Sequence, residues 1–587
     1  VTVNASGTPG NDVAIRLVGA DHLIFDGINV TNGGTSSDNF CEVGYELATL
    51  GTDDGASHNI IRNCTINMAW GTMRPVLSRG IRTSLTSINS PSGASSHNIF
   101  RNIVIDGVET GIYLGGAYFM EATDNEISGC TFGSNVPIGN NAEGSSGTGI
   151  AIVIADQTNC RISGNVIDSV RVTNSAATGS AMGIYIFRSA GDVSGNKVHH
   201  VFQGGIAFSG ISVGIYASAN FAGSLVINNN MIRGISNGYA GAGSNIVSVN
   251  GMISINSSST IKVPVHWYYN TVEMNDEVNK LYSSSAFTIS ANNGNHQVTL
   301  KNNILVNRIV AATDSNWSFA IVDFNSSLLN LTSDYNNLFV SAPGSYVGYN
   351  QVNTAFSASL LNWRTNNPGK DVHSVSFSPA FVSPEDLHLD PDSNGVLMNA
   401  AIPVSGVIAD FDATVRDPVT PDIGADEICT TAVVIPQIVI SSDILPVINE
   451  GESIEFNALT TDAGPFPNLQ WLVNGIPAGF ASSTFSTSTL QNGDTVSCML
   501  ISSLACGSAQ PVYSNPIIIT VYSFIPTNTL LEYYSTGWGN TECFHALDTI
   551  VTSGDWGYFE IYSEGSVELI AGKSIFLKPG TVVYSGG

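Results

Sequence analysis

Apolar and polar positions in the first 428 residues follow a repeating pattern: an apolar residue, two small or polar residues, an asparagine, any residue and a second apolar residue. The pattern is clear in Ile162-Ser-Gly-Asn165-Val-Ile167. The repeated asparagines are Asn165, Asn196, Asn230, Asn270 and Asn303, with looser versions at Asn63, Asn102, Asn125 and Asn337. From Asn125 onward the repeats are 31 to 40 residues apart, which indicates loops of variable length between constant strands.

A second recurring element, a glycine and an isoleucine followed by alternating apolar residues, precedes many of these strands. It occurs at Gly111-Ile112, Gly149-Ile150, Gly183-Ile184 and Gly214-Ile215. Short strands joined by turns, without a helical period, predict that each repeat is one coil of a parallel β-solenoid, and therefore an all-β protein. The asparagines should then line up on consecutive coils, because Asn tolerates a left-handed bend and its amide can bond to the Asn of the next coil.

A closing segment follows the repeats. It contains Ser378-Pro-Ala-Phe381, Asp386-Leu-His-Leu389, Asp412-Ala-Thr-Val-Arg416 and Pro421-Asp-Ile-Gly-Ala-Asp-Glu427. With these motifs, residues 1–428 resemble the right-handed parallel β-helix repeat proteins of the pectate-lyase-like superfamily, in the form found in secreted proteins of the Bacteroidota. The resemblance implies an extracellular β-helix and says little about activity, because one fold hosts many functions. We expect residues 412–427 to lock the C-terminal end of this helix, with Arg416 paired to a surrounding acid.

Residues 429–522 and 523–587 predict two further β modules. In the first, a strand with Trp471, the hairpin signal Asn474-Gly475 and a later strand with Cys498 resemble an immunoglobulin-like or PKD-like sandwich. The usual cross-sheet disulfide is absent, so we expect Cys498 to pair with Cys506 across the last hairpin. The second module, with Glu542-Cys-Phe-His-Ala546, resembles the small repeat called the three-coathanger stack, and we expect it to be incomplete at its C-terminus.

Composition narrows the classes of partner. Charged residues make up 11% of the chain, and 47 acidic against 20 basic side chains give a net charge of −27. No basic stripe can neutralise phosphates, so we expect no nucleic-acid partner. No apolar run approaches the ~18 residues of a membrane span, so we expect no transmembrane segment. Eight cysteines, an even number in a β-rich chain, indicate an oxidising, extracellular or cell-surface setting.

Three residues are the best candidates for catalysis. Asp156, Arg188 and Asp192 are expected on adjacent coils, where they would form either a catalytic group or a structural ion pair. The Asn-Thr-Asp, Gly-His-Gly and Arg-Ile-Lys motifs of a galacturonan hydrolase of this fold are absent from the sequence. Lysine and arginine, one of which a lyase needs as a base near acid-bound calcium, are scarce in the repeats.

Histidines offer a possible metal chemistry. His22, His58 and His97 recur at the same place in three consecutive repeats and predict a stacked column, which either binds zinc or caps the turns. Four residues after each of them lie Asp26, Arg62 and Arg101, which predict a second, outward column. Alternation along a strand should direct the consecutive side chains of His199 and His200 to opposite faces, where they cannot chelate one ion together.

Two further motifs have an ordinary structural interpretation beside a functional one. Asp390, Asp392 and Asn394 match the first half of an EF-hand loop that lacks its terminal glutamate, which leaves a weak calcium site or an acidic turn. The run Trp267-Tyr268-Tyr269 is a candidate platform for stacking sugars, although alternation should bury Trp267.

The sequence therefore favours a secreted or cell-surface, non-enzymatic protein that acts as an adhesin or as a structural subunit of an extracellular assembly. In this interpretation a β-helical rod stands on spacer modules. We expect surface glycans or other copies of the chain as partners and no cofactor, with a calcium ion at the acidic turn as the alternative. The alternative is a carbohydrate-active β-helical enzyme, a polysaccharide lyase or glycoside hydrolase tethered by its C-terminal modules.

Overall fold

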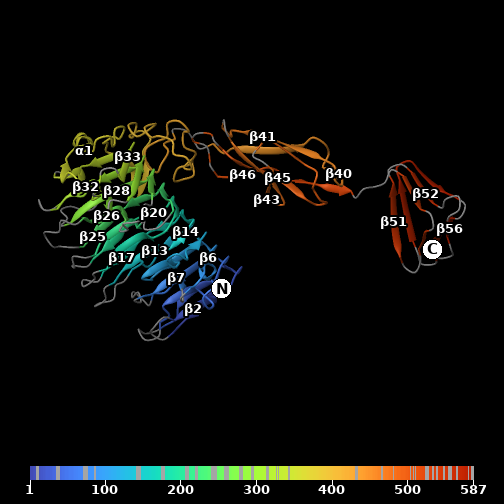
Figure 1. The fold of residues 1–587 in the computed structure, drawn as a ribbon, viewed down its shortest axis with the longest axis horizontal. Helices are drawn as coiled ribbons and strands as arrows, with labels where there is room; N and C mark the ends of the chain where they lie inside the picture. The colour runs from blue at the N-terminus through green and yellow to red at the C-terminus, as the bar shows by residue number, and fades with distance from the viewer. Residues whose placement is uncertain are drawn as a thin grey trace. The chain divides into compact units, whose positions relative to one another are not determined.

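β-Strands are the main secondary structure of the chain, as the computed structural model shows (Figure 1). The chain divides into two units, residues 1–433 and residues 434–587. The structure describes residues 1–583 apart from residues 8–11, 35–39, 70–76, 85–87, 140–146, 174–178, 205–209, 219–222, 239–246, 257–263, 276–281, 292–295, 312–315, 326, 328–329, 342–343, 430–433, 465–466, 480–481, 503, 505, 507, 509, 523–527, 532–533, 537–539, 547–548, 553–557, 563–565 and 579–580.

Most described strands of the first unit belong to two large sheets in which nearly all neighbours run parallel. The 12-stranded sheet contains β2 (Val13–Val18), β5 (Val43–Ala48), β7 (Arg79–Ser84), β9 (Thr110–Gly115), β13 (Gly149–Ala155), β18 (Ala181–Phe187), β22 (Ser212–Ser218), β26 (Val247–Asn256), β29 (Ser283–Ala291), β32 (Ser318–Asp323), β35 (Tyr346–Asn350) and β36 (Ala355–Ser357). The 19-stranded sheet contains β1 (Thr2–Ala5), β3 (Ile24–Asp26), β4 (Asn29–Asn32), β6 (Ile60–Asn67), β8 (Ile99–Asp106), β11 (Glu126–Ser128), β12 (Thr131–Phe132), β15 (Cys160–Ser163), β16 (Val166–Ile167), β19 (Gly191–Ser194), β20 (Lys197–Val198), β23 (Leu225–Asn228), β24 (Met231–Arg233), β27 (Pro264–Tyr268), β28 (Thr271–Met274), β30 (Gln297–Lys301), β31 (Ile304–Asn307), β33 (Leu331–Asp334) and β34 (Asn337–Val340).

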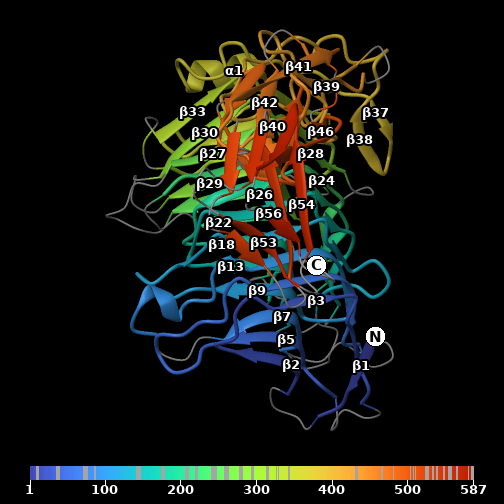
Figure 2. The ribbon, with the colours of Figure 1, turned by 90° about the vertical axis from the view of Figure 1, so that its right-hand side faces the viewer.

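The strands follow one another as stacked coils (Figure 2). In one coil the chain runs through β13, β14 (Gln157–Thr158), β15, β16 and β17 (Val170–Val172), and β18 then begins the next coil beside β13. The register holds from coil to coil, with Ile152 of β13 beside Ile112 of β9 and Ile184 of β18. The third side of the coils is a short sheet of β17, β21 (Val201–Gln203) and β25 (Ile235–Asn237). The repeated strand pattern is therefore one rung of a parallel β-stack, and the fold is all-β.

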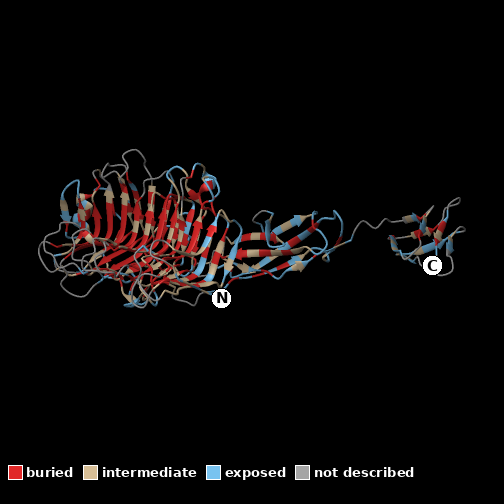
Figure 3. Cartoon of the chain, turned by 90° about the horizontal axis from the view of Figure 1, so that it is seen from below, coloured by how far each residue is buried: buried red, intermediate tan, exposed pale blue. Residues whose placement is uncertain are grey.

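Apolar side chains from the facing sheets fill the inside of the coils. They form one continuous cluster that reaches from Leu17 to Trp363, and the buried residues follow the stacked strands (Figure 3). Each fully buried isoleucine or leucine contributes roughly 1.5–3 kcal/mol relative to an exposed one. The repeated apolar positions of the sequence are therefore what holds successive coils together.

The recurring glycine–isoleucine element exists because the 12-stranded sheet has room for only a hydrogen or a methyl group at one position of each coil. A Cβ at Gly183 would lie 2.5 Å from the carbonyl oxygen of Gly214 and 2.6 Å from the Val198 side chain. Gly111 occupies the same position in its coil, but Gly149 does not. In this coil the register puts Ala151 level with Gly111 and Gly183. Gly149 therefore lies two residues before the position that the sequence pattern predicted for it.

Buried asparagines form a ladder at the bend between the paired short strands of the 19-stranded sheet. The backbone nitrogen and the amide nitrogen of Asn196 both donate to Asn230 Oδ1, at 3.0 and 2.9 Å. The same double contact joins every step of the series Asn165, Asn196, Asn230, Asn270, Asn303 and Asn336. Each asparagine therefore satisfies backbone groups that the bend would leave unpaired.

The looser matches do not belong to this ladder. In the last coil Asn336 holds the ladder position, and Asn337 bonds to the backbone of Phe377 instead. Asn63 and Asn102 lie one position before the ladder position of their coils. Each has a φ of 54° and forms the left-handed bend itself. Asn125 belongs to a second ladder at a different corner, in which Asn98 donates to Asn125 Oδ1 and Asn125 donates to Gln157 Oε1. Asparagines therefore have two distinct roles in these coils. Some form buried hydrogen bonds to the next coil, and others adopt the left-handed backbone conformation of the bend.

The last coil ends at the short helix α1 (Leu360–Asn366), whose fully buried Trp363 lies close to Gly348. The closing segment, with β37 (Phe381–Ser383) and β38 (Asp386–Leu389), docks elsewhere. Its backbone bonds to Thr271 and Asn302 on two successive coils. The segment thus lies along the side of the coils and does not cover their end, where α1 packs on the last coil. The expected pairing of Arg416 with an acid is confirmed, since Arg416 Nη1 lies 3.2 Å from Glu427 Oε2.

The second unit begins with antiparallel strands around Trp471. They are β39 (Gln437–Ser442), β41 (Ile454–Thr461) and β44 (Thr484–Thr487) in one sheet, and β42 (Asn468–Val473), β43 (Ile476–Ala478), β45 (Thr495–Ile501), β46 (Val512–Tyr513) and β47 (Ile517–Ile518) in another. A parallel pair, β40 (Val447–Asn449) and β48 (Thr520–Tyr522), completes them. The two inner faces share one apolar cluster, as in a sandwich.

Cysteine pairing in this module differs from the prediction. Cys498 is a free thiol, fully buried on the inner face of β45 beside Trp471 of β42. Cys506 lies beyond the strand in a turn, and its disulfide bond is with a cysteine other than Cys498. The predicted bond between the two is wrong because strand alternation directs Cys498 into the core.

The last part of the chain has its own apolar cluster, which includes Ile550 and Phe559. Its strands pair in parallel: β49 (Asn528–Leu531), β52 (Thr549–Thr552) and β55 (Ser574–Leu577); β50 (Tyr534–Thr536), β53 (Phe559–Ile561) and β56 (Thr581–Val583); and β51 (Thr541–Ala546) with β54 (Ser566–Ala571). This spacing of about 25 residues between paired strands is shorter than that of the coils in the first unit.

Candidate ligand-binding site

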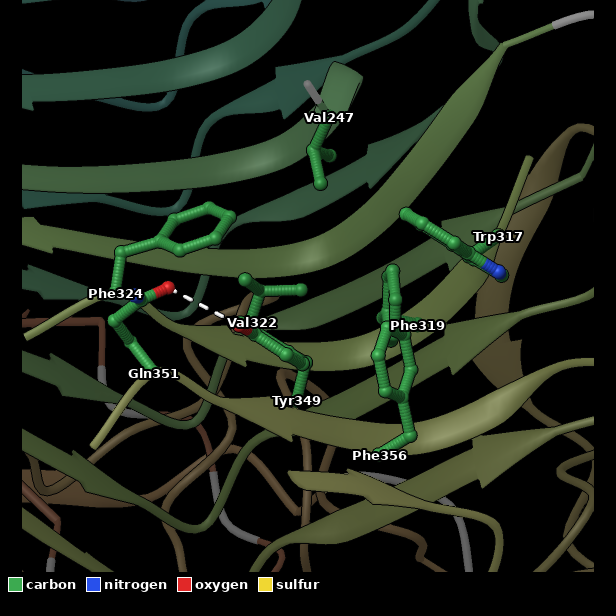
Figure 4. Close-up of a pocket in the computed structure, with 8 residues that line it drawn as sticks. All are labelled: Val247, Trp317, Phe319, Val322, Phe324, Tyr349, Gln351 and Phe356. Carbon is green, nitrogen blue, oxygen red and sulfur yellow. Dashed lines mark hydrogen bonds between the residues drawn. The ribbon is translucent and has the colours of Figure 1, made fainter. Parts of the chain in front are cut away.

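An open pocket of about 330 Å³ lies on the outer side of the 12-stranded sheet, near the end that α1 covers. Strands β26, β32, β35 and β36 and the turns beside them supply its walls. We call it the aromatic pocket, and Figure 4 shows its lining: Val247, Trp317, Phe319, Val322, Phe324, Tyr349, Gln351 and Phe356. The aromatic rings gather around one hollow instead of joining the interior cluster.

An irregular alternation in β32 puts these side chains outside the coil. Ala320 and Ile321 both belong to the interior cluster. Phe319 and Val322, on either side of them, belong to a separate outer cluster. The pairing with β35 joins Phe319 to Tyr346 and Ile321 to Gly348, and it does not include Ala320 between them. The small residue that lets each coil approach the facing sheet therefore also determines which aromatic residues face outward.

The rings contact one another at tilted angles. Phe356 is the centre of the group, with its ring centroid 4.9 Å from Tyr349, 5.2 Å from Trp317 and 6.0 Å from Phe319. Pairs at 4.5–7 Å in tilted arrangements stabilise each other and leave parts of their faces open. Phe356 is 41% exposed, whereas Phe319 is 2% exposed, so Phe356 forms a rim and Phe319 the floor.

Polar groups are few in the aromatic pocket. The Tyr349 hydroxyl donates to Gln351 Oε1 at 3.1 Å, as the dashed line in Figure 4 shows. None of the described lining residues carries a charge. An apolar, aromatic wall with a fixed amide and hydroxyl suits the flat apolar face and the hydroxyl groups of a sugar ring. It offers no carboxylate pair for cleaving a glycosidic bond.

The run that the sequence suggested for sugar stacking has a structural task instead. Trp267 is fully buried and donates to Ser254 Oγ at 3.3 Å. Tyr269 is also buried, and its hydroxyl donates to the Ile402 carbonyl of the closing segment at 2.8 Å. The aromatic pocket was not predicted. Its signal in the sequence is the concentration of aromatic residues between 317 and 356, but their direction depends on the register of β32.

The candidate catalytic residues are only partly brought together. Asp156 Oδ2 lies 2.6 Å from Arg188 Nη2, and both residues have positive φ at the corner that follows the 12-stranded sheet. The guanidinium of Arg188 also lies over the ring of Tyr118 at 4.9 Å. Asp192 is on β19 of the other large sheet, where it accepts from Asn228 at 2.9 Å. The geometry is that of an ion pair buried against an aromatic ring, and Asp192 is not part of it.

The histidine column is in register. His22, His58 and His97 all have positive φ, and their rings stack with centroids 4.7 and 4.6 Å apart. Their shared task is to occupy the left-handed corner of three successive coils. In the second column, Arg62 pairs with Asp26 at 2.8 Å. These are exposed contacts of modest energy.

His199 and His200 lie on the same side of the chain, so the expectation of opposite faces is wrong. His200 has a φ of 55°, which breaks the alternation, and the two ring centroids are 4.8 Å apart. Asp168 of the preceding coil faces both rings, with Oδ1 3.3 Å from His199 Nε2 and 3.8 Å from His200 Nδ1. Burial lowers the pKa of His199 to about 4.

The turn with the partial EF-hand pattern directs its groups to different partners. Asp390 accepts from the backbone of Asp392 at 3.0 Å. The buried amide of Asn394 is used by backbone groups: it donates to the carbonyls of Ala380 and Asp390 at 2.7 and 2.8 Å. Asn394 thus closes the turn, and its side chain is not directed toward a shared point with the two carboxylates.

No protein-family model matches the sequence, and no curated protein matches it. No helix among the residues that the structure describes is long and apolar enough to cross a bilayer. Fold and site together define an all-β repeat protein of stacked parallel strands that carries an uncharged aromatic pocket on the outer side of one sheet.

Proposed function

We propose that this protein is a secreted or cell-surface, non-enzymatic adhesin that binds a glycan in the aromatic pocket. The observation that carries the proposal is the open pocket in which the aromatic side chains of Trp317, Tyr349 and Phe356 lie beside the Gln351 amide. Aromatic faces bind the C–H face of a sugar, and an amide next to them can bond to its hydroxyl groups. The pocket is rigid because its strands are fixed by the stacked coils, so little ordering is lost on binding.

The assignment to a superfamily and to a bacterial lineage rests on the sequence resemblance. We infer a right-handed β-helix of the pectate-lyase-like superfamily, of the type secreted by Bacteroidota, followed by Ig/PKD-like and three-coathanger-stack-like spacer modules. The motifs in residues 378–427 support this lineage. The net charge of −27 opposes non-specific binding to nucleic acid.

The enzyme alternative finds less support in the site. Asp156 is already paired with Arg188, and the described lining of the aromatic pocket has no carboxylate. A glycosidase needs two carboxyl groups on either side of the scissile bond. Self-association into an extracellular assembly is the second candidate use of such a solenoid.

The test is a glycan array followed by titration calorimetry with the ligands found. Trp317→Ala and Phe356→Ala should weaken binding by about 5- to 150-fold, since losing one stacked ring costs roughly 1–3 kcal/mol. Phe119→Ala is the matched control, because Phe119 is an aromatic residue that is 69% exposed and lies outside the pocket. Binding that is unchanged in both pocket variants, or that is lost equally in the control, would remove the proposal.

A further inference from the structure

We propose that Asp168, His199 and His200 form a binding site for a divalent transition-metal ion such as zinc. One possible ligand atom from each residue lies within 4.8 Å of the other two. Imidazole nitrogen and carboxylate oxygen are ordinary zinc ligands, and three protein ligands with a water in the fourth position make a complete tetrahedral set. Neither the fold nor the aromatic pocket requires this cluster.

The distances are close to those of a zinc site. Zinc binds nitrogen and oxygen at about 2.0–2.2 Å, so two ligands of a tetrahedron are about 3.3–3.6 Å apart. Asp168 Oδ1 and His199 Nε2 are 3.3 Å apart. His200 Nδ1 is 3.8 Å from the same oxygen and 3.1 Å from the Asp168 carbonyl oxygen. Because the His200 side chain is 53% exposed, a small rotation can release the carbonyl contact and bring this nitrogen closer to the carboxylate.

A carboxylate faces the other nitrogen of His200. Glu385 Oε2, in the turn between β37 and β38, is 3.6 Å from His200 Nε2. Histidines that bind a metal usually direct their second ring nitrogen toward a carboxylate or carbonyl, which orients the ring. Arg233 Nη2 lies 3.7 Å from the other oxygen of this carboxylate, Glu385 Oε1. Glu385 thus fits the role of an orienting group, and Arg233 balances its charge.

The position of the ligands gives the ion a structural role. Asp168 follows β16, and the two histidines follow β20, which is the equivalent strand of the next coil. A bound ion would therefore join two successive coils, and the contact to Glu385 would extend this joint to the closing segment. An ion that binds only the folded protein raises its stability by mass action.

The experiment uses the full chain without a histidine tag, freed of metal with chelator. Zinc chloride is titrated against it by competition with a chromogenic chelator, and the melting temperature is measured with and without zinc. We expect one zinc ion per chain and a higher melting temperature. His200→Gln and Asp168→Asn should each weaken binding at least 10-fold and abolish the zinc-dependent shift, since losing even an orienting group costs about 10- to 100-fold.

His373→Gln is the matched control. His373 Nδ1 lies 2.7 Å from Asp334 Oδ2, so it is another exposed histidine–aspartate pair without a second imidazole. This variant should bind zinc like the wild type. The proposal is overturned if the wild type binds no zinc, or if folded His200→Gln and Asp168→Asn proteins, checked by circular dichroism, bind zinc as tightly as the wild type does.

Discussion

The guanidinium of Arg416 lies over the ring of Tyr269, with Cζ 4.0 Å from the ring centroid. Arg416 is 3% exposed, and its Nη1 is 3.2 Å from Glu427 Oε2. Its Nη2 donates to Asn229 Oδ1 and to the Gly424 carbonyl, both at 2.9 Å. One side chain of the closing segment therefore bonds within the segment and to two successive coils, which makes it the centre of the lateral contact.

Replacing Arg416 should destabilise this contact strongly. Arg416→Met would leave the Glu427 carboxylate buried without its cation, and breaking a buried pair costs about 3–5 kcal/mol. The measurement is urea unfolding followed by tryptophan fluorescence. Arg62→Met, which removes the exposed partner of Asp26, is the control and should cost no more than about 1 kcal/mol. Equal midpoints for both variants would show that the closing segment does not depend on Arg416.

Stability should fall at alkaline pH because of His388. The bond to Asp412, with a further bond to Asp386, raises the pKa of His388 to about 9 in spite of burial. An unfolded histidine titrates near 6.5, so the stabilisation is complete below that pH and is lost as the pH rises through about 9. Thermal melting between pH 6 and 9.5 should therefore decline more steeply for the wild type than for His388→Gln.

Burial also raises the pKa of Asp422 to about 7, but this carboxylate is present in both proteins and its effect cancels in the comparison. Parallel melting curves for the wild type and His388→Gln would contradict the assignment of a charged imidazole to this cluster.

The asparagine ladder should be sensitive at every step. Asn230 accepts from the backbone and the amide of Asn196, and it donates to the Val193 carbonyl at 2.9 Å. Asn230→Ala leaves these buried groups unpaired, at about 1–3 kcal/mol each. Asn102→Gly is the contrasting change, since Asn102 is exposed at a bend with φ of 54°, where glycine is equally suited. Differential scanning calorimetry should show a lower melting temperature for the first variant and little change for the second.

The sequence was informative where one side chain has one task in every coil. The Asn165–Asn196–Asn230 spacing predicted stacked coils because a buried amide at a bend bonds to its equivalent in the next coil. The His22 and His58 column followed from the same regularity. These features depend on short-range backbone geometry that repeats.

The features that the sequence did not predict depend on side-chain directions and contacts that the repeat pattern does not reveal. A left-handed φ at His200 puts two histidines on one side. Ala320 and Ile321 both face the interior, so Phe319 faces outward. The closing segment bonds to coils more than a hundred residues earlier, through Arg416 and Asn229 for example. Period and composition contain no information about such long-range contacts.

Thiol chemistry should distinguish the observed state of Cys498 from the predicted one. The free cysteines are Cys41, Cys64, Cys130, Cys160, Cys498 and Cys543. Cys543 alone among them is exposed, and burial raises the pKa of Cys130 and Cys160 to about 12. A thiol reagent should therefore label one residue in the native protein and all six after denaturation without reductant. Mass spectrometry that finds Cys498 unlabelled after denaturation would restore its pairing.

The last prediction concerns catalysis at Asp156. Since Asp156 is paired with Arg188 at 2.6 Å and buried, we expect Asp156→Asn to lower stability by about 1.5–3 kcal/mol, the usual value of a hydrogen bond to a charged group. Asp192→Asn, which changes a carboxylate bonded to Asn228, is the control and should cost less. We expect the wild type to release no reducing ends or unsaturated products from pectin, alginate or chondroitin, with or without calcium. Turnover by the wild type that Asp156→Asn abolishes without unfolding the protein would favour the carbohydrate-active enzyme over the adhesin.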